Sequence, residues 1–451
     1  MRLQLEKSPQ GQVKRNKDAI LKTSLHFTRE FALMISFQNL FCIRLLMAIL
    51  ALPVLVGFAQ TRYDQQYRPQ VQFSPEHNWT NDPNGLVYFE GEYHLFFQYN
   101  PQGTSWGHMS WGHAVSSDLL HWKELPVAIL ETADEMIFTG SVVVDERNSS
   151  GLCEAGKACL VAIYTAHSGT GERQREAQNI AASQDRGRTW RNFSGNPVLD
   201  LKMRDFRDTN VSWNDSVHAW IMAVSLPNEH KIAFYSSSDL KQWKRESTFG
   251  PEGAIGGQWE CPDLLHLPGV NGMKDVWALK VGVNPGSLQG GSGEQYFLGN
   301  FDGKTFTLGK EQGSHGWTDY GKDSYCAISY NNLPTHASPT LIGWMNNWQY
   351  ADKLPTTPWR GQMTLARRLS VVRDKAGLVL SQDPVIADQR VLPARRVDLR
   401  VKAKDETSNL MVSKAPLELR LTFSGGDAIY TACESFLMTS IGLRSVSINM
   451  L

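Results

Sequence analysis

The sequence has no excess of charge of either sign. Its 451 residues contain 45 Lys and Arg and 45 Asp and Glu, so the formal net charge is zero. Without a basic face or tail, nucleic acid and anionic membrane surfaces are not expected partners. Hydrophobic residues make up 41% of the chain and charged residues 20%, which is ordinary for a globular protein and argues against general disorder. A neutral partner is therefore favoured.

The sequence also lacks the motifs of several common enzyme classes. The stretch GSLQGGSG, which begins at residue 286, has no Lys and does not form a phosphate-binding loop. Kinase and serine-hydrolase motifs are missing too. The cysteines show no metal-ligand spacing, so neither a metal nor a cofactor is expected. The six cysteines are Cys42, Cys153, Cys159, Cys261, Cys326 and Cys433.

Two of these cysteines are close along the chain. Cys153 and Cys159 could bridge a hairpin loop in an oxidising compartment. The remaining cysteines are predicted to be free, buried thiols.

One apolar run stands out near the N-terminus, and it is too short to span a membrane comfortably. The run LLMAILALPVLVGFA follows Arg44 and ends in small residues, so cleavage after Ala59 is predicted. We expect residues 1–59 to be an upstream extension and a signal peptide of bacterial style, with Met34 as a reasonable initiator. The mature protein would then be periplasmic or extracellular, without a membrane anchor.

Long helical periodicity is missing until a weak pattern at residues 383–392. What recurs instead is a short theme of an acid, a turn and an apolar residue on an outgoing strand, as in SSDLLHWKEL and SSDLKQWKRE. The theme occurs five times, and its acids are separated by 67, 54, 63 and 72 residues. Such a period suits one four-stranded antiparallel blade with variable loops. The five acids are Asp118, Asp185, Asp239, Asp302 and Asp374.

This repeat predicts an all-β protein with a five-bladed β-propeller at residues 60–380. The intervening stretches, such as YHLFFQYN and CLVAIYTA, are β-rich and are separated by Gly, Asn, Asp and Pro. A connector at 381–394 is expected to lead into a C-terminal β-sandwich at 395–451. That segment is shorter than a complete sandwich domain, so the second domain is expected to be truncated.

Acidic residues occupy similar places in several predicted blades. About 20 residues after successive theme acids come Phe138, Phe206, Glu260 and Tyr325, and FRDT places Asp208 beside the second of these positions. The pentapeptide NDPNG, with Asp82, opens the first blade. Because the first strand of each propeller blade lines the central channel, these positions should converge.

Three carboxylates placed close together require an explanation, because crowded acids repel and raise one another's pKa values. Taken singly, Asp82 could be a turn residue and Asp208 could form a surface ion pair with Arg207. Glu260, between Trp259 and Cys261, is harder to explain in this way, since charged residues in such surroundings are seldom buried without a role. Glycoside hydrolysis uses one ionised and one protonated carboxyl group, and it accounts for the set.

Three motifs make the interpretation specific. WTNDPNG, FRDT and WECPD, in this order and separation, resemble the signature motifs of glycoside hydrolase family 32, the β-fructofuranosidases, which include levanases, inulinases and invertases. The resemblance extends from about residue 67 to 390 and includes FFQYNP, WGHAVS, FTGS and GWMNNW. It implies a secreted enzyme that cleaves β-D-fructofuranosyl linkages in levan, inulin or sucrose with retention and releases fructose.

The same resemblance implies roles for individual residues. Asp82 would be the nucleophile that attacks C2 of the fructosyl unit, and Glu260 would be the general acid and then the base. Asp208, which Arg207 is expected to keep ionised, would hold sugar hydroxyls and stabilise the transition state. Further substrate-binding residues implied by the family are Asn81, Gln98, Trp106, Phe138, Thr139, Arg207 and Trp344.

The chain departs from the family pattern at two motif positions. Thr80 stands where the family usually has Met, and Thr209 follows Asp208 where the family usually has Pro. The second change adds a hydroxyl and frees the backbone, which could alter the aim of Asp208.

Two alternatives remain open at this point. One is a related five-bladed hydrolase that cleaves arabinan or xylan with inversion, again with three acids. The other is an inactive or weakly active propeller that only binds fructan. The stereochemistry of the product separates the first from a retaining enzyme, and release of fructose separates the second.

Overall fold

The computed structural model describes residues 63, 65–69, 71–269, 274–311, 315–374, 377–386, 417–419 and 436–438. All of them belong to one compact unit, Tyr63–Leu451. The predicted signal peptide, Cys42 and Cys433 lie outside the described residues, as does nearly all of the predicted sandwich. From that last region the structure describes two short strands, β24 (Leu417–Leu419) and β25 (Phe436–Met438), which pair antiparallel.

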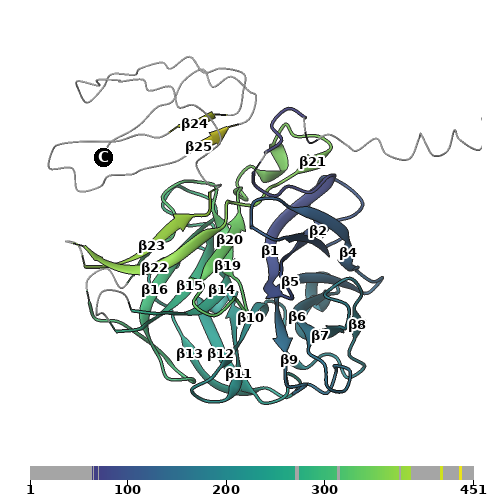
Figure 1. Cartoon of the computed structure of the whole chain (residues 1–451), viewed down its shortest axis with the longest axis vertical. Coiled ribbons are helices and arrows are strands. Elements are labelled where there is room, and N and C mark those ends of the chain that lie inside the picture. Colours follow the sequence, from purple (N-terminus) through teal and green to yellow (C-terminus); the bar gives the residue numbers. More distant parts are fainter. Residues whose placement is uncertain are drawn as a thin grey trace, which may run out of the picture. The chain divides into compact units, whose positions relative to one another are not determined.

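The remaining described strands form five sheets, which follow one another along the chain as the five predicted blades (Figure 1). Four strands of each sheet pair antiparallel in sequence order. Blade 1 consists of β1 (Asn78–Phe89), β2 (Glu92–Asn100), β3 (Ser110–Ser116) and β4 (Lys123–Ile129). Blade 2 consists of β5 (Glu135–Asp145), β6 (Cys159–Ser168), β7 (Arg175–Ser183) and β8 (Arg191–Asn192), with β9 (Leu199–Met203) also paired to β7.

Blades 3 to 5 repeat this arrangement. Blade 3 consists of β10 (Arg207–Asn214), β11 (Ala219–Leu226), β12 (Lys231–Ser237) and β13 (Lys244–Phe249). Blade 4 consists of β14 (Gln258–Leu267), β15 (Val276–Asn284), β16 (Gly293–Phe301) and β17 (Phe306–Leu308), with β18 (His315–Trp317) paired to β16. Blade 5 consists of β19 (Tyr325–Ser329), β20 (Thr340–Trp344), β22 (Arg367–Asp374) and β23 (Gly377–Pro384). The described helices are the short 3₁₀ turns η1 (Gly171–Arg173), η2 (Pro227–Glu229) and η3 (Ala351–Lys353).

The five acids of the repeated theme all lie at the connection between the third and fourth strand of a blade. Four of them follow the third strand, and Asp374 ends it. The carboxylates of the other four, Asp118, Asp185, Asp239 and Asp302, close the turn by accepting backbone N–H bonds; Asp239, for example, accepts from Lys241 at 2.9 Å and Gln242 at 2.8 Å. The repeat in the sequence therefore marks the blades. Each turn places an Asp at the same point, where its carboxylate can accept backbone N–H bonds.

Two details differ from the prediction. Strand β23 continues through Pro384, past the expected boundary at 380, and residues 383–384 are strand rather than part of the weak helical pattern. The cysteines differ as well. Cys153 and Cys159 form a disulfide, but Cys261 and Cys326 form a second one instead of remaining free thiols. Strands β14 and β19 are neighbours in the ring of inner strands around the channel, a proximity that spacing along the chain could not reveal.

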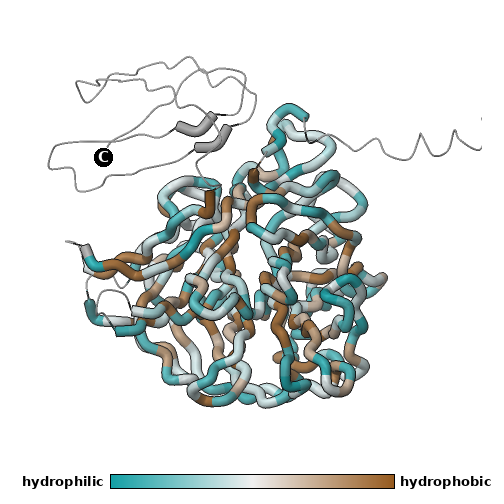
Figure 2. Tube along the Cα trace, viewed as in Figure 1, coloured by the Kyte–Doolittle hydropathy of each residue, from teal (hydrophilic) through white to brown (hydrophobic). Residues whose placement is uncertain are grey.

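Apolar residues of neighbouring sheets pack against each other, and Figure 2 shows the hydrophobic stretches concentrated in the strands. Ile163 of blade 2 and Met222 of blade 3 share one such cluster, and Leu298 of blade 4 and Leu369 of blade 5 share another. Packing between blades buries both faces of most sheets, which explains why many strands read as continuous apolar runs. No helix among the described residues has the length and apolar character needed to cross a membrane.

The first strands of the blades, β1, β5, β10, β14 and β19, contact one another in a closed cycle around the channel. Two features tie this cycle together. Strand β21 (Trp359–Arg360), which follows β20 of blade 5, pairs parallel with the start of β1. After β19, the side-chain amide of Asn331 donates to the carbonyls of Val142 at 3.0 Å and Val211 at 2.9 Å, which belong to blades 2 and 3. Asn331 therefore links blade 5 to two other inner strands.

We predict that Asn331→Ala destabilises the propeller by about 2 kcal/mol, because two hydrogen bonds to carbonyls of different blades are lost at about 1 kcal/mol each. Urea unfolding measures the effect. Asn300→Ala, at an exposed strand position, is the matched control and should change stability little. Equal stability of the two variants would show that Asn331 does not tie the blades together.

Candidate active site

The residues of interest lie where the inner strands depart from regular pairing. In blade 3, Arg207 pairs with Ser225 and Asn210 with Ala223, so two residues of β10 stand opposite one residue of β11. This is a β-bulge, which inserts an extra residue and redirects the neighbouring side chains. The same irregularity interrupts the first pair of strands in every blade. The residues between the flanking pairs are Asn81 and Asp82, Phe138 and Thr139, Asp208 and Thr209, Cys261 and Pro262, and Cys326 and Ala327.

The bulges bring the three predicted acids to one place. Asp82 lies in the bulge of β1 and Asp208 in that of β10, while Glu260 is the last paired residue before the bulge of β14. The charges of Asp208 and Glu260 both act on Asp82, which shows that the carboxyl groups are close. The predicted convergence is therefore correct, and the positions counted from the repeat fall within two residues of each bulge.

Asp82 remains partly exposed to solvent. The hydroxyl of Thr139, from the bulge of blade 2, donates to its Oδ2 atom at 3.4 Å. Its Oδ1 atom is buried and has no hydrogen-bond partner among the described residues. A carboxylate oxygen without a protein partner is suited to meet a substrate atom.

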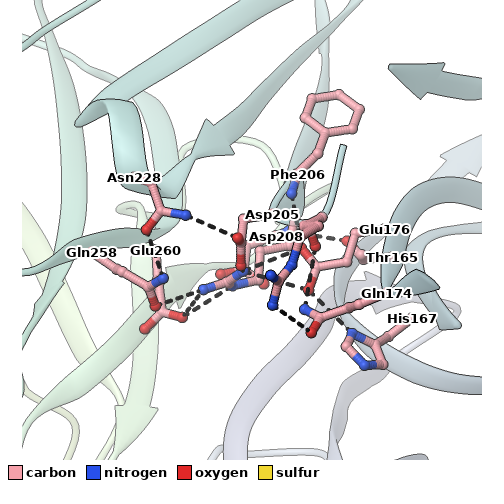
Figure 3. Close-up of polar contacts among 12 residues, drawn as sticks. Thr165, His167, Gln174, Glu176, Asp205, Phe206, Asp208, Asn228, Gln258 and Glu260 are labelled. Carbon is pink, nitrogen blue, oxygen red and sulfur yellow. Dashed lines mark hydrogen bonds and ion pairs between the residues drawn. The ribbon is translucent and has the colours of Figure 1, made fainter. Parts of the chain in front are cut away.

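Arg207 is the hub of the polar contacts around the site. Its guanidinium donates to Glu260 Oε1 at 2.9 Å, to Gln258 at 2.9 Å and to Asp205 at 3.0 Å. It also forms an ion pair with the buried Glu176 at 3.2 Å. Figure 3 shows Glu260 and Gln258 on one side of this network of contacts and Glu176 on the other. Arg207 therefore fixes the direction of Glu260.

The expectation that Arg207 keeps Asp208 ionised is wrong. Burial raises the pKa of Asp208 to about 7, and the charge of Glu260 also raises it, against the opposing effects of Arg207 and the Cys261 N–H. Within the described chain, Arg207 forms no ion pair with Asp208, because its guanidinium is engaged by other acids. Burial likewise raises the pKa of Asp82 well above its usual value, and the charges of Asp208 and Glu260 raise it further.

Asp208 is held by neighbours on both sides. It is 6% exposed and has a φ angle of 66°, in the left-handed region that its bulge position imposes. Its backbone N–H donates to the hydroxyl of Thr165 at 3.0 Å, and its Oδ2 accepts from the N–H of Cys261 at 3.0 Å. The hydroxyl of Thr209 donates to the carbonyl of Ile163 at 3.2 Å. Thr209 thus anchors this backbone to blade 2 rather than freeing it.

Four of the predicted binding residues form two pairs, one aromatic and one polar. Phe138 and Trp106 pack edge to face with ring centroids 6.1 Å apart, and Trp106 is 47% exposed, so it can present an aromatic face to a ligand. Asn81 and Gln98 are buried and already make protein contacts: Asn81 accepts from the Trp79 indole N–H at 2.8 Å, and Gln98 donates to the Ile137 carbonyl at 3.0 Å.

Trp344, a further predicted binding residue, is also fully buried. It packs between Trp79, at a ring-centroid distance of 6.1 Å, and Trp348, at 4.8 Å. Its indole N–H has no hydrogen-bond partner in the described part of the chain.

Sequence reasoning gave no role to several residues that shape the site. The Tyr325 hydroxyl forms a short hydrogen bond with Glu260 Oε2, and burial, followed by the charge of Glu260, raises its pKa well above the usual value, so it stays protonated. The repeat spacing did select Tyr325 as a channel position. Glu176, Gln258 and Thr165 lie outside every motif and outside the inner-strand bulges, and no signal in the sequence marks them.

The acids adjoin the second disulfide. One oxygen of the Asp82 carboxylate and the sulfurs of Cys261 and Cys326 lie within 4.8 Å of one another. Cross-linked sulfurs are not thiolates, so this group does not offer the ligand set of a soft metal ion. The arrangement can instead supply a nucleophilic carboxylate, a second carboxyl group held by Arg207 and Tyr325, and a third beside them.

Comparisons with known proteins agree with this chemistry. Residues 72–384 match the model of the glycosyl hydrolases family 32 N-terminal domain. The chain is 46% identical over 327 residues to a levanase of Bacillus subtilis, an alignment that covers 72% of this chain and 47% of the levanase. It is 44% identical over 371 residues to an extracellular exo-inulinase of Aspergillus ficuum, covering 76% of this chain and 69% of that protein.

Solved structures resemble the fold as well. An exo-inulinase from Aspergillus awamori matches with a TM-score of 0.69 and 41% identity, over 74% of this chain and 71% of that one. A β-fructofuranosidase from Schwanniomyces occidentalis, solved with fructosyl-erythritol, matches with a TM-score of 0.68 and 36% identity, over 82% and 71% of the two chains. The chain spans about half the length of the levanase and about 70% of these other relatives.

The raised pKa of Asp208 leads to a prediction about stability. Between the usual value of 3.8 and about 7, the folded protein binds more protons at this site than the unfolded chain, so the contribution of Asp208 to stability falls as pH rises. Asp208→Asn should therefore raise Tm at pH 8 and raise it less at pH 5. Each unit of pKa shift corresponds to about 1.4 kcal/mol.

Asp239→Asn is a control of opposite sign. Against a partial burial that raises it, the backbone N–H groups of Gln242 and Lys241 lower the pKa of Asp239, so the ionised form stabilises the fold. This variant should lose stability at pH 8. A fall in Tm at pH 8 for Asp208→Asn would contradict the electrostatic assignment of the site.

Proposed function

Because the chain belongs to glycosyl hydrolases family 32, we propose that it is a retaining hydrolase of β-D-fructofuranosyl linkages in fructans or sucrose. The product is fructose. The observation that carries this proposal is the meeting of Asp82, Asp208 and Glu260 at the bulges of three inner strands. Retaining glycosidases use two carboxyl groups, one as nucleophile and one as acid and then base.

We assign the nucleophile to Asp82. Its Oδ1 has no hydrogen-bond partner among the described residues, and Thr139 orients Oδ2 from the neighbouring blade. In the first step Asp82 attacks C2 of the fructosyl unit, the bond from C2 to the leaving oxygen breaks, and a covalent fructosyl-enzyme forms. Attack requires the ionised carboxylate. Burial and the charges of Asp208 and Glu260 raise the pKa of Asp82, so the ionisation of Asp82 depends on the charges of these two acids.

Glu260 is the proposed acid and base. It protonates the leaving oxygen in the first step and removes a proton from water in the second, which releases fructose and restores Asp82. Both of its oxygens are held, Oε1 by Arg207 at 2.9 Å and Oε2 by the Tyr325 hydroxyl. Held in this way, the carboxyl group keeps its direction through both steps.

Asp208 is proposed to bind sugar hydroxyls and to stabilise the charge that develops on the sugar. Among the described residues, its carboxylate contacts the Cys261 N–H and the Cys261 sulfur, both through Oδ2, which leaves Oδ1 for the substrate. Trp106 and Phe138 would flank the sugar. No observation favours a binding protein without activity, because Thr209 is anchored and Asp208 keeps its supports.

The proposal extends to location and domain organisation. A curated relative is named an extracellular exo-inulinase, and the signal-like run before Ala59 fits secretion to the periplasm or the outside of the cell. We assign catalysis to the propeller at 60–380 and a β-sandwich to the segment 395–451.

The direct experiment incubates the purified protein with sucrose, inulin and levan. We expect fructose from at least one substrate, and NMR of the first product should show the β anomer, which means retention. Asp82→Asn should lower turnover at least about a thousandfold. An absence of fructose, or an initial α anomer, would overturn the proposal.

Glu260→Gln tests the acid through the leaving group. Hydrolysis of sucrose, whose leaving oxygen needs a proton, should slow about a hundredfold to ten-thousandfold. The first step on a fructosyl fluoride, whose leaving group needs none, should slow much less. Glu252→Gln, at an exposed loop position, is the control and should act like wild type on both substrates. Equal slowing of Glu260→Gln on both substrates would remove Glu260 from the acid role.

A further inference from the structure

The second disulfide occupies an unusual place for a structural bridge. It joins Cys261, which directly follows Glu260, to Cys326, which directly follows Tyr325. Glu260 and Tyr325 are the two residues whose side chains share a short hydrogen bond across the gap between blades 4 and 5. Two neighbouring strands are thus joined twice at the same level, once by a covalent bond and once by the hydrogen bond of the proposed acid.

Both cysteines occupy the first position of an inner-strand bulge. Their φ angles are 48° and 50°, in the left-handed region that Asp208 adopts at the corresponding position of blade 3. A bulge interrupts the ladder of hydrogen bonds, so the backbone at these positions is not fixed by regular strand pairing. The disulfide supplies the missing constraint where the catalytic residues need it.

The bridge also touches the other two acids. The backbone N–H of Cys261 donates to Asp208 Oδ2 at 3.0 Å, and the Cys261 sulfur lies 3.7 Å from the same oxygen. On its other side, both sulfurs lie within 4.8 Å of an oxygen of Asp82. A shift of the Cys261 backbone would therefore move Glu260 and the donor to Asp208 together.

The surroundings leave Tyr325 little room to follow such a shift on its own. Gly282 of β15 pairs with Glu260 of β14 within blade 4. A Cβ atom at Gly282 would lie 2.9 Å from a ring carbon of Tyr325, so the ring packs directly against that backbone. The ring depends on the positions of both strands.

From these contacts we propose that the Cys261–Cys326 disulfide is a positioning element of the reaction. It holds the Tyr325 hydroxyl on Glu260 and thereby aims the proton of Glu260 at the leaving oxygen. The inference rests on the proposed function. Neither cysteine reacts with substrate; both act through Tyr325 and Glu260.

The test removes the bridge with Cys261→Ala and Cys326→Ala together. Because misplacement of a catalytic group by about 1 Å can cost about a hundredfold in rate, we expect kcat on sucrose to fall at least about tenfold while KM changes less than about threefold. The first step on a fructosyl fluoride should be much less affected, since it needs no proton from Glu260.

Cys153→Ala with Cys159→Ala is the matched control, because it removes the other disulfide, in blade 2. Its Tm should fall, but its ratio of rates on the two substrates should match wild type. If the alanine pair at 261 and 326 does not fold, serine at both positions replaces it, and peptide mapping without reductant confirms the bridge in wild type.

A cycle with Tyr325→Phe completes the test. If the bridge acts through Tyr325, the triple variant should turn over sucrose about as fast as Tyr325→Phe alone, because the two changes remove the same support. Multiplicative losses would overturn the proposal, as would wild-type kinetics in the variant without the bridge, or an equal loss on both substrates. Inactive wild-type protein would instead refute the proposed function itself.

Discussion

The site depends on a break in strand pairing that recurs at one level of all five inner strands. A regular strand points its side chains alternately to the two faces of its sheet, and in a propeller those faces are covered by neighbouring blades. The bulge places two residues opposite one and so breaks this alternation, and it does so in every blade. Asp82 and Asp208 are bulge residues, and Glu260 and Tyr325 directly precede bulges. The site is therefore built on the same backbone bulge in every blade, with different side chains at the bulge in each.

The same crowding sets the electrostatics. Burial and mutual repulsion raise the pKa values of Asp82 and Asp208. The guanidinium of Arg207 forms its ion pairs with Glu260, Glu176 and Asp205 instead. Such a site costs folding stability, as is usual where groups are placed for reaction rather than for packing. The blade interfaces and the Cys153–Cys159 disulfide offset this cost elsewhere in the propeller.

The blades could be predicted from the sequence because their turns depend on residues that are close together along the chain. Each hairpin needs an acid at its turn, so five turns at blade spacing revealed five blades, and counting from them reached the inner strands. The acids followed from the motifs around Asp82, Asp208 and Glu260. The partners of Arg207 could not be predicted, since Glu176 and Gln258 come from other strands and carry no motif. The Cys261–Cys326 bridge was missed because 65 residues separate the two cysteines along the chain, and only the packing of blades 4 and 5 brings them together.

The central claim is that Asp82 forms a covalent bond to fructose, and trapping that bond tests it most directly. The protein is treated with a mechanism-based fructosyl label whose enzyme adduct hydrolyses slowly, and the digested protein is analysed by tandem mass spectrometry. The account predicts one fructosyl adduct, on the carboxylate of Asp82 in the peptide that contains NDPNG. An adduct on Asp208 or Glu260, or turnover that never yields an adduct and inverts the anomeric centre, would contradict it.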